Sequence, residues 1–324
     1  MESKDYCKLL VNGLSFHQHN VRFCTTNQTG PIVSEYGETP KELVKKILQI
    51  KKEAASKIPD ECTNCIYKDE TSIVTDKITR IDLFYWYHCN CRCFYCTYRD
   101  ETKGEYSDKV KYGNPKIYET IKELYKANKI DNSNLEVIFG GGEIGVLKEF
   151  PKLIDLFLKH DVHNIWCETS GIKHLRALDK VLKKGKGGLT VAVCAGSADV
   201  YKKIKQRDKY KQVMSTLKKY VKATKKHKQN PNNLERVISK FIILEGFNNN
   251  REEIDKWLNE GVKAGLKYFE ISMEFCWGTK TKAGKKVEDY NYELFDYAEN
   301  KCRELGLILH KNATSLALMK KGTY

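Results

Sequence analysis

Four cysteines fall within the stretch "YHCNCRCFYCTYRD", residues 87–100. Cys89, Cys93 and Cys96 have the spacing C-x3-C-x2-C. Three thiolates on one tight loop can hold three irons of a cubic [4Fe-4S] cluster and leave the fourth iron open to a substrate or cofactor. Cys91 lies between these positions and has no place in the spacing, so we assign it no ligand role. The loop alone leaves two alternatives open, a zinc site and a group of unligated thiols.

A second cysteine pair lies before this loop and supports the zinc alternative. Cys62 and Cys65 form C-x2-C, as do Cys93 and Cys96, and the two pairs could be the halves of a zinc ribbon. The 57 Lys and Arg residues outnumber the 42 Asp and Glu residues, which gives a formal net charge of +15. A basic field attracts anions such as nucleotides, phosphorylated sugars or RNA. A zinc-ribbon-like nucleic-acid-binding protein without catalysis is therefore the alternative function.

Composition and charge patterning indicate the cellular environment in which we expect the protein. Its twelve cysteines are expected to be reduced and used for ligation, which fits a cytoplasmic protein. No run of about 18 apolar residues is present, and the N-terminal residues do not resemble a secretion signal, so we expect no membrane span. Residues 202–228 hold eleven lysines, which form either a solvated helical face or a patch that binds anions.

The elements that must position the cysteine loop alternate along the chain. We expect strands over 79–87, 135–139, 164–169, 188–194, 236–244 and 267–275, and helices over 116–128, 147–160, 173–184, 210–224, 250–265 and 291–306. This pattern predicts an α/β fold with a parallel sheet, either an open six-unit barrel or a doubly wound sheet. In both, the site lies at the carboxyl ends of the strands, and the cysteine loop directly follows the first strand.

Residues 1–78 have a different pattern from residues 79–324, and we predict a boundary between them. A hairpin of short strands is expected within residues 7–26, followed by a helix over residues 39–57. Thr39 is a good N-cap for this helix, and Pro40 suits its first position. The first segment is thus a small α+β extension that contains cysteines.

A glycine run follows the second expected strand. In "GGGE", Gly140 to Glu143, the missing side chains let the backbone approach a ligand closely. The cysteine loop after strand one, with Tyr95 before its last cysteine, and Gly-Gly-Glu after strand two together resemble the radical S-adenosylmethionine (SAM) enzymes. The resemblance covers about residues 79–275 and implies a partial (β/α)6 TIM-like barrel. It also implies that the cluster cleaves SAM to a 5′-deoxyadenosyl radical, which abstracts hydrogen from a substrate.

The resemblance extends to particular residues. Cofactor-binding roles are implied for Tyr95, Gly140, Gly141, Gly142, Glu143, Glu168, Thr169, Ser170, Cys194, Ser197, Lys240 and Ile242. Of these, Gly140–Glu143 would bind the amino group of SAM, and Glu168–Ser170 would line its ribose. Cys194 stands where relatives have an acidic residue or serine that contacts a ribose hydroxyl. Ser197 is the nearest residue that could make this contact instead. Lys240 would pair with the SAM carboxylate, and Ile242 would pass near the adenine.

Further cysteines raise two more expectations. Cys7, Cys24, Cys62 and Cys65 resemble the SPASM and twitch modules that hold an auxiliary cluster, although here they precede the barrel. A second [4Fe-4S] cluster, a zinc ion and separate structural thiols all remain open for them. Cys276, after the sixth strand, is a weak candidate for a catalytic hydrogen donor.

The resemblance also implies partners. A flavodoxin- or ferredoxin-type protein would donate the electron. The basic charge favours an anionic substrate, such as a nucleotide-linked sugar, a phosphorylated metabolite or RNA, and a peptide is also open. The sequence specifies neither the substrate nor the outcome of the reaction.

Overall fold

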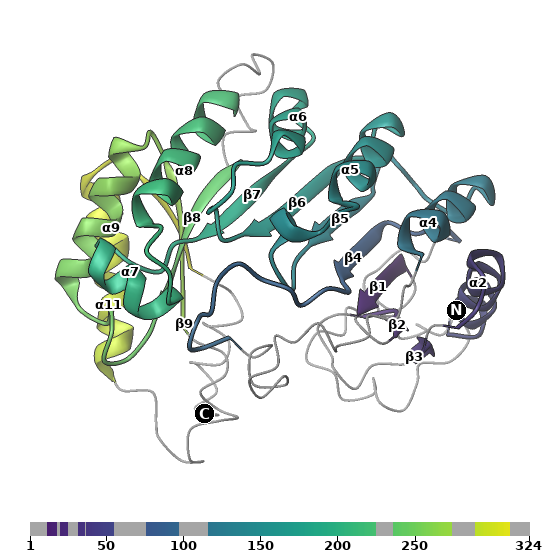
Figure 1. The fold of residues 1–324 in the computed structure, drawn as a ribbon, viewed down its shortest axis with the longest axis horizontal. Helices are drawn as coiled ribbons and strands as arrows, with labels where there is room; N and C mark the ends of the chain where they lie inside the picture. The colour runs from purple at the N-terminus through teal and green to yellow at the C-terminus, as the bar shows by residue number, and fades with distance from the viewer. Residues whose placement is uncertain are drawn as a thin grey trace, which may run out of the picture. The chain divides into compact units, whose positions relative to one another are not determined.

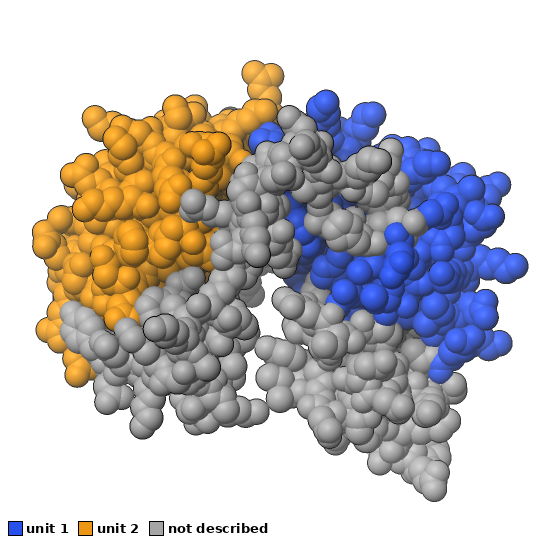
Figure 2. Space-filling model, turned by 60° about the horizontal axis from the view of Figure 1, so that its bottom comes forward, with its two compact units in different colours: residues 1–88, 108–167 blue, residues 89–107, 168–324 orange. Residues whose placement is uncertain are grey.

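The computed structural model describes residues 12–17, 20–24, 32–35, 37–54, 76–96, 116–224, 236–273 and 289–311. The chain divides into two compact units, coloured separately in Figure 2. Unit 1 consists of residues 1–88 and 108–167, and unit 2 consists of residues 89–107 and 168–324. The chain passes from one unit to the other directly before Cys89, so the cysteine loop belongs to unit 2 and the GGGE segment to unit 1.

Unit 1 is built on parallel strands that continue into an antiparallel meander (Figure 1). Strands β4 (Arg80–Phe84), β5 (Glu136–Phe139) and β6 (Asn164–Thr169, of which residues 164–167 belong to this unit) are paired in parallel. Strand β1 (Gly13–His17) pairs in parallel with β4 and antiparallel with β2 (Val21–Arg22), which pairs with β3 (Ile32–Ser34). The hairpin expected near the N-terminus is confirmed, whereas β3 and the β1–β4 pairing were not expected. The domain boundary at residue 78 stays a prediction.

Helices α2 (Pro40–Ala54), α4 (Ile117–Lys126) and α5 (Phe150–Lys159) and the short 3-10 helix η2 (Ile144–Val146) complete the described elements of unit 1. The predicted N-cap of α2 is confirmed. The amide of Thr39 donates to the Glu42 carboxylate at 2.9 Å, and the Glu42 amide donates to Thr39 Oγ1 at 3.4 Å. This reciprocal capping box satisfies two backbone donors that the first helical turn leaves unpaired.

Unit 2 holds four parallel strands, β7 (Gly187–Ala192), β8 (Val237–Ile243), β9 (Tyr268–Met273) and β10 (Ile308–Lys311). Its helices are α6 (Arg176–Lys184), α7 (Ala198–Lys205), α8 (Tyr210–Thr224), α9 (Arg251–Lys263) and α11 (Asp289–Glu304). Trp257 of α9 is buried between Phe241 and Phe269, with ring centroids 5.0 and 5.1 Å away. Its indole nitrogen donates to Ser239 Oγ at 2.7 Å, so this aromatic core has no unpaired polar atom on the indole.

The six expected strands correspond to β4–β9, and the α/β class with parallel strands is confirmed; β10 was not expected. Several strands are shorter than predicted. The strand predicted over 188–194 ends at Ala192, and it could not include Cys194, whose φ of 58° is a left-handed conformation that a strand cannot contain. Among the described residues, no helix is both long and apolar enough to span a membrane.

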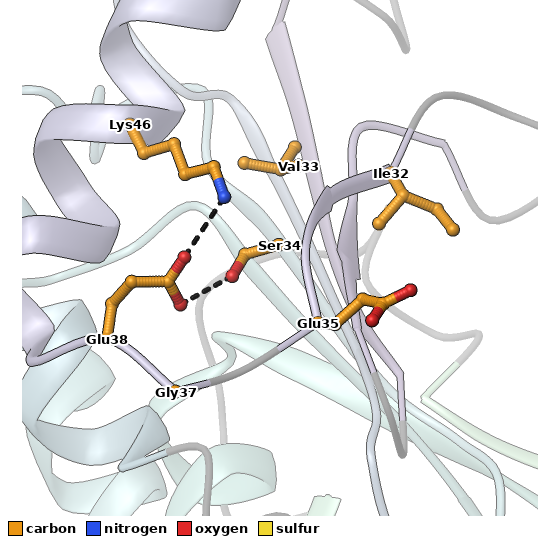
Figure 3. A pocket seen from close by; sticks show the side chains of 7 residues that line it. All are labelled: Ile32, Val33, Ser34, Glu35, Gly37, Glu38 and Lys46. Atoms are coloured by element: carbon orange, nitrogen blue, oxygen red, sulfur yellow. Dashed lines mark hydrogen bonds and ion pairs between the residues drawn. The ribbon is translucent and has the colours of Figure 1, made fainter.

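A pocket of about 420 Å³ lies beside β3 in unit 1 (Figure 3). The side chains of Ser34 and Lys46 both point to the Glu38 carboxylate, which accepts from Ser34 Oγ at 2.5 Å and from Lys46 Nζ at 3.0 Å. None of the residues predicted to bind a cluster or SAM is among the described residues that line it.

Candidate functional site

The cysteine loop of unit 2 is held by its own backbone and by the end of α7. The Arg92 amide donates to the carbonyl of Lys205 at 3.1 Å, and the Phe94 amide donates to that of Ile204 at 3.3 Å. The Cys96 amide donates to the Cys93 carbonyl at 3.2 Å and closes a tight turn between these two predicted ligands. The loop therefore has a fixed path through Cys93.

Cys91 differs from its neighbours in burial. It is 2% exposed, whereas Cys89, Cys93 and Cys96 are half-buried. The Cys91 amide donates to Cys89 Sγ at 3.4 Å, a type of bond that stabilises a thiolate. Hydrogen bonding with Cys89, together with burial, raises the pKa of the Cys91 thiol to about 12. Cys91 thus packs inward, beneath the predicted ligands.

Asn90 ties the same loop to two other segments of unit 2. Ser170 Oγ donates to its side-chain oxygen at 3.0 Å, and Arg207 Nε donates to its carbonyl at 2.9 Å. Thr169 Oγ1 accepts from the Gly171 amide at 3.1 Å. Two of the three residues predicted to line the SAM ribose are therefore engaged in local bonds that shape the end of β6. Asn90 and Arg207 were not among the predicted site residues.

The buried side chains of Cys194 and Lys205 meet the half-buried side chain of Tyr95. Lys205 Nζ donates to Tyr95 Oη at 2.8 Å and lies 3.5 Å from Cys194 Sγ, while the Tyr95 and Cys194 side chains are 3.4 Å apart. Tyr95, Phe94 and Ile242 pack against the apolar cluster that Cys194 forms with Ile204 and Leu244. Tyr95, Cys194 and Ile242, which the sequence placed near the cofactor, are thus brought together.

The backbone of Cys194 is held in its left-handed conformation from two sides. Its amide donates to the Lys240 carbonyl at 3.1 Å, and its carbonyl accepts from Asn248 Nδ2 at 2.8 Å. A residue other than glycine in this conformation is strained, and such strain persists only where the surroundings enforce it. Ser197 is bound elsewhere, because its hydroxyl donates to Glu253 Oε1 at 2.8 Å.

Three charged side chains from three strands of unit 2 interact electrostatically. Lys240 of β8 donates to Glu270 of β9 at 2.8 Å, and the two residues are register partners. The Glu168 side chain at the end of β6 is exposed, and its carboxylate interacts electrostatically with Lys240 and Glu270. Lys240 therefore already has an anionic partner, and Glu270 is a charged residue that the sequence patterns did not indicate.

The GGGE segment of unit 1 packs against the chain that leaves β4. The Gly142 amide donates to the Trp86 carbonyl at 2.8 Å, and the Glu143 amide donates to the His88 carbonyl at 2.8 Å. A Cβ atom on Gly142 would lie 2.4 Å from the His88 carbonyl oxygen, and Gly141 has a φ of 96°. The buried Glu143 carboxylate accepts from the Gly145 amide at 3.0 Å. The glycines are thus required by close backbone packing next to the residue that precedes Cys89.

Several predicted residues lie outside the described part of the chain: Cys7, Cys62, Cys65 and Cys276. Cys24 is described and buried. Across the described residues, no three His, Cys, Asp or Glu side chains are gathered into a metal-ligand group. The donor chemistry of Cys89, Cys93 and Cys96 nevertheless fits a cluster, because one loop carries three thiols and supplies an amide to the Cys89 sulfur.

Comparison with models of protein families identifies the family of this chain. Residues 84–260 match the model of the "Radical SAM superfamily". The chain belongs to the radical SAM superfamily. The matched range covers more than half of the protein and includes both the cysteine loop and GGGE. Membership in this superfamily indicates an enzyme, implies a [4Fe-4S] cluster and SAM, and gives no support to a zinc-ribbon protein. Comparison with curated proteins finds no match.

Solved structures share the fold of this chain. SuiB from Streptococcus suis has a TM-score of 0.54 at 12% identity, over 86% of this chain and 56% of SuiB. SuiB bound to SAM gives 0.55 at 12% identity over the same shares. SuiB bound to its precursor peptide SuiA gives 0.53 at 11% identity, over 95% of this chain and 73% of SuiB. The chain thus spans just over half the length of the first two structures, and the expected fold class is confirmed.

Proposed function

We propose that this radical SAM protein binds a [4Fe-4S] cluster through Cys89, Cys93 and Cys96 and uses it to cleave SAM. The observation that carries the proposal is the family match over residues 84–260, within which these three thiols are the more accessible members of the loop and Cys91 is buried. When bound, the cluster and SAM supply a 5′-deoxyadenosyl radical, which abstracts a hydrogen atom from the substrate.

The chain's own residues would bind and orient these groups. Gly140–Glu143 would receive the amino group of SAM, the region of Glu168–Ser170 its ribose, and the cluster of Tyr95, Cys194 and Ile242 would border it. Lys240 would contact the SAM carboxylate in exchange for part of its pairing with Glu270. Ser197, which is bonded to Glu253, is the least favoured of the proposed contacts.

A peptide is the substrate class that we favour among the four left open by the sequence. The support is that SuiB, which has a similar fold, is described in complex with a precursor peptide. A flavodoxin- or ferredoxin-type protein would donate the electron. We also retain an auxiliary cluster on Cys7, Cys24, Cys62 and Cys65 and a hydrogen-donor role for Cys276 as proposals.

Anaerobic reconstitution with iron and sulfide tests the proposal. The wild-type protein should turn brown and, with dithionite, convert SAM to 5′-deoxyadenosine and methionine. Cys93→Ala should abolish this product, because only three thiolates hold the cluster, whereas Cys91→Ala should retain it. A Cys91→Ala variant without product, next to an active Cys89→Ala variant, would show that the ligands are assigned to the wrong cysteines.

A further inference from the structure

Lys205 is a buried cation that none of the motifs accounts for. Its side chain is 2% exposed, and its Nζ donates to Tyr95 Oη at 2.8 Å and to Cys194 Sγ at 3.5 Å. It also lies 5.3 Å from the centre of the Tyr95 ring. Within the described part of the chain, no carboxylate pairs with it. Burying an ammonium group is strongly unfavourable unless an anion compensates it, so this lysine requires a negative charge nearby.

Two candidate sources of that charge are close to Lys205: the Cys194 sulfur, 3.5 Å from its Nζ, and a cluster held by the loop to which its partner Tyr95 belongs. Tyr95, the hydrogen-bond partner of Lys205, stands between Cys93 and Cys96, two of the proposed cluster ligands. Cys93 is the middle ligand of the proposed cluster. A [4Fe-4S] cluster on three thiolates is anionic, and its negative charge grows when it accepts an electron, so a buried cation favours the reduced form.

Two kinds of contact connect Lys205 to the cysteine loop. The first is the hydrogen bond that Lys205 Nζ donates to the phenol oxygen of Tyr95, which stands two residues after Cys93 in the loop. The second is the backbone, because the carbonyls of Ile204 and Lys205 accept from the amides of Phe94 and Arg92, on either side of Cys93. Lys205 is therefore held against the loop of the predicted ligands both by its backbone carbonyl and by its ammonium group.

We propose that Lys205 is a positioning residue whose buried ammonium, acting through Tyr95, stabilises the reduced cluster and raises its midpoint potential. This inference rests on the proposed function, because it needs the cluster on Cys89, Cys93 and Cys96. The reduction is a one-electron step, and the electron comes from an added reductant such as dithionite. Lys205 itself gains and loses no proton in it.

The test is a redox titration of the reconstituted protein, followed by the electron paramagnetic resonance signal of the reduced cluster. Lys205→Met removes the charge and should shift the midpoint potential to more negative values at unchanged iron content. Lys205→Arg keeps the charge and should stay close to the wild-type potential. Lys203→Met is the matched control, since Lys203 lies exposed on the same helix and should leave the potential unchanged.

The outcomes separate this inference from the proposed function. A wild-type protein without a cluster signal overturns both. A wild-type cluster whose potential is the same in Lys205→Met, or shifts equally in Lys203→Met, overturns only the role of Lys205. If Lys205→Met fails to retain iron, Lys205→Arg decides: a loaded cluster at the wild-type potential supports the need for charge, and loss of iron in this variant as well refutes it.

Discussion

Lys240 Nζ lies 2.8 Å from Glu270 Oε1, across the register pair that joins β8 to β9. Both side chains are largely buried, and the Glu168 carboxyl adds a second negative charge to their surroundings. The lysine that the sequence assigned to the SAM carboxylate is thus shared between two carboxylates. In the protein without SAM, Lys240 therefore compensates the negative charge of these carboxylates.

Lys240→Met should therefore destabilise the protein. Removing one partner of a largely buried pair leaves the other charge uncompensated, and we expect the free energy of unfolding to fall by about 2 kcal/mol in urea titrations. The double variant Lys240→Met with Glu270→Gln should recover part of this loss, because it removes the orphaned charge as well. A single variant as stable as the wild type would show that the pair contributes nothing.

Glu143 should matter for SAM affinity through its charge. Its carboxylate also accepts from the Gly145 amide, so Glu143→Ala would remove a structural bond together with the charge. Glu143→Gln keeps an acceptor oxygen and is the sharper variant. We expect about tenfold weaker SAM binding in anaerobic calorimetry, since a hydrogen bond to a charged group contributes about 1.5 kcal/mol. Iron content should not change, and Glu136→Gln, at an exposed carboxylate of β5, is the control. Unaltered affinity in Glu143→Gln would remove this residue from the SAM site.

Lys51 should make stability depend on pH. Its buried ammonium has no hydrogen-bond partner among the described residues, and burial lowers its pKa to about 8. An unfolded lysine titrates near pH ~10.4, so between these values the unfolded chain binds more protons, and stability rises with pH. Lys51→Met should raise the free energy of unfolding by about 2 kcal/mol at pH 7, and this gain should shrink as the pH is raised through ~10.

Lys52→Met is the matched control for Lys51, because Lys52 is exposed on the same helix. Urea titrations at pH 7 and above pH ~10 check the prediction. Equal stabilisation at both would mean that the gain comes from the methionine side chain and not from removing a buried charge.

The N-terminal cysteines should hold a second cluster. Four thiols suit one cubane, and the binding energy of a cluster would add to the stability of the folded segment. Iron analysis should give about eight irons per chain. The triple variant Cys89→Ala, Cys93→Ala, Cys96→Ala should keep about half of them. An iron-free, colourless triple variant would exclude the second cluster, and a variant with one zinc would assign a structural metal site.

The sequence by itself determined the alternation of strands and helices, the cap of α2 and the motifs of the superfamily. These features are local: the side-chain period defines each element, Thr39 and Glu42 stand one helical turn apart, and the cysteine spacing is a property of one loop. Tyr201, Ile204 and Lys205 also have the i, i+3, i+4 spacing of one helical face, so the burial of Lys205 had a signal within the lysine-rich run.

Only the tertiary structure decided which polar residues meet. Lys240 pairs with Glu270 because β8 and β9 align in one register, and nothing within either strand specifies that register. Lys205 reaches Tyr95 because backbone carbonyls at the end of α7 accept hydrogen bonds from amides of the cysteine loop. Ser197 bonds Glu253 rather than facing a ligand, since α9 brings that carboxylate to it. Such contacts join residues far apart in the chain, and their partners are selected by packing of whole elements, which residue spacing does not encode.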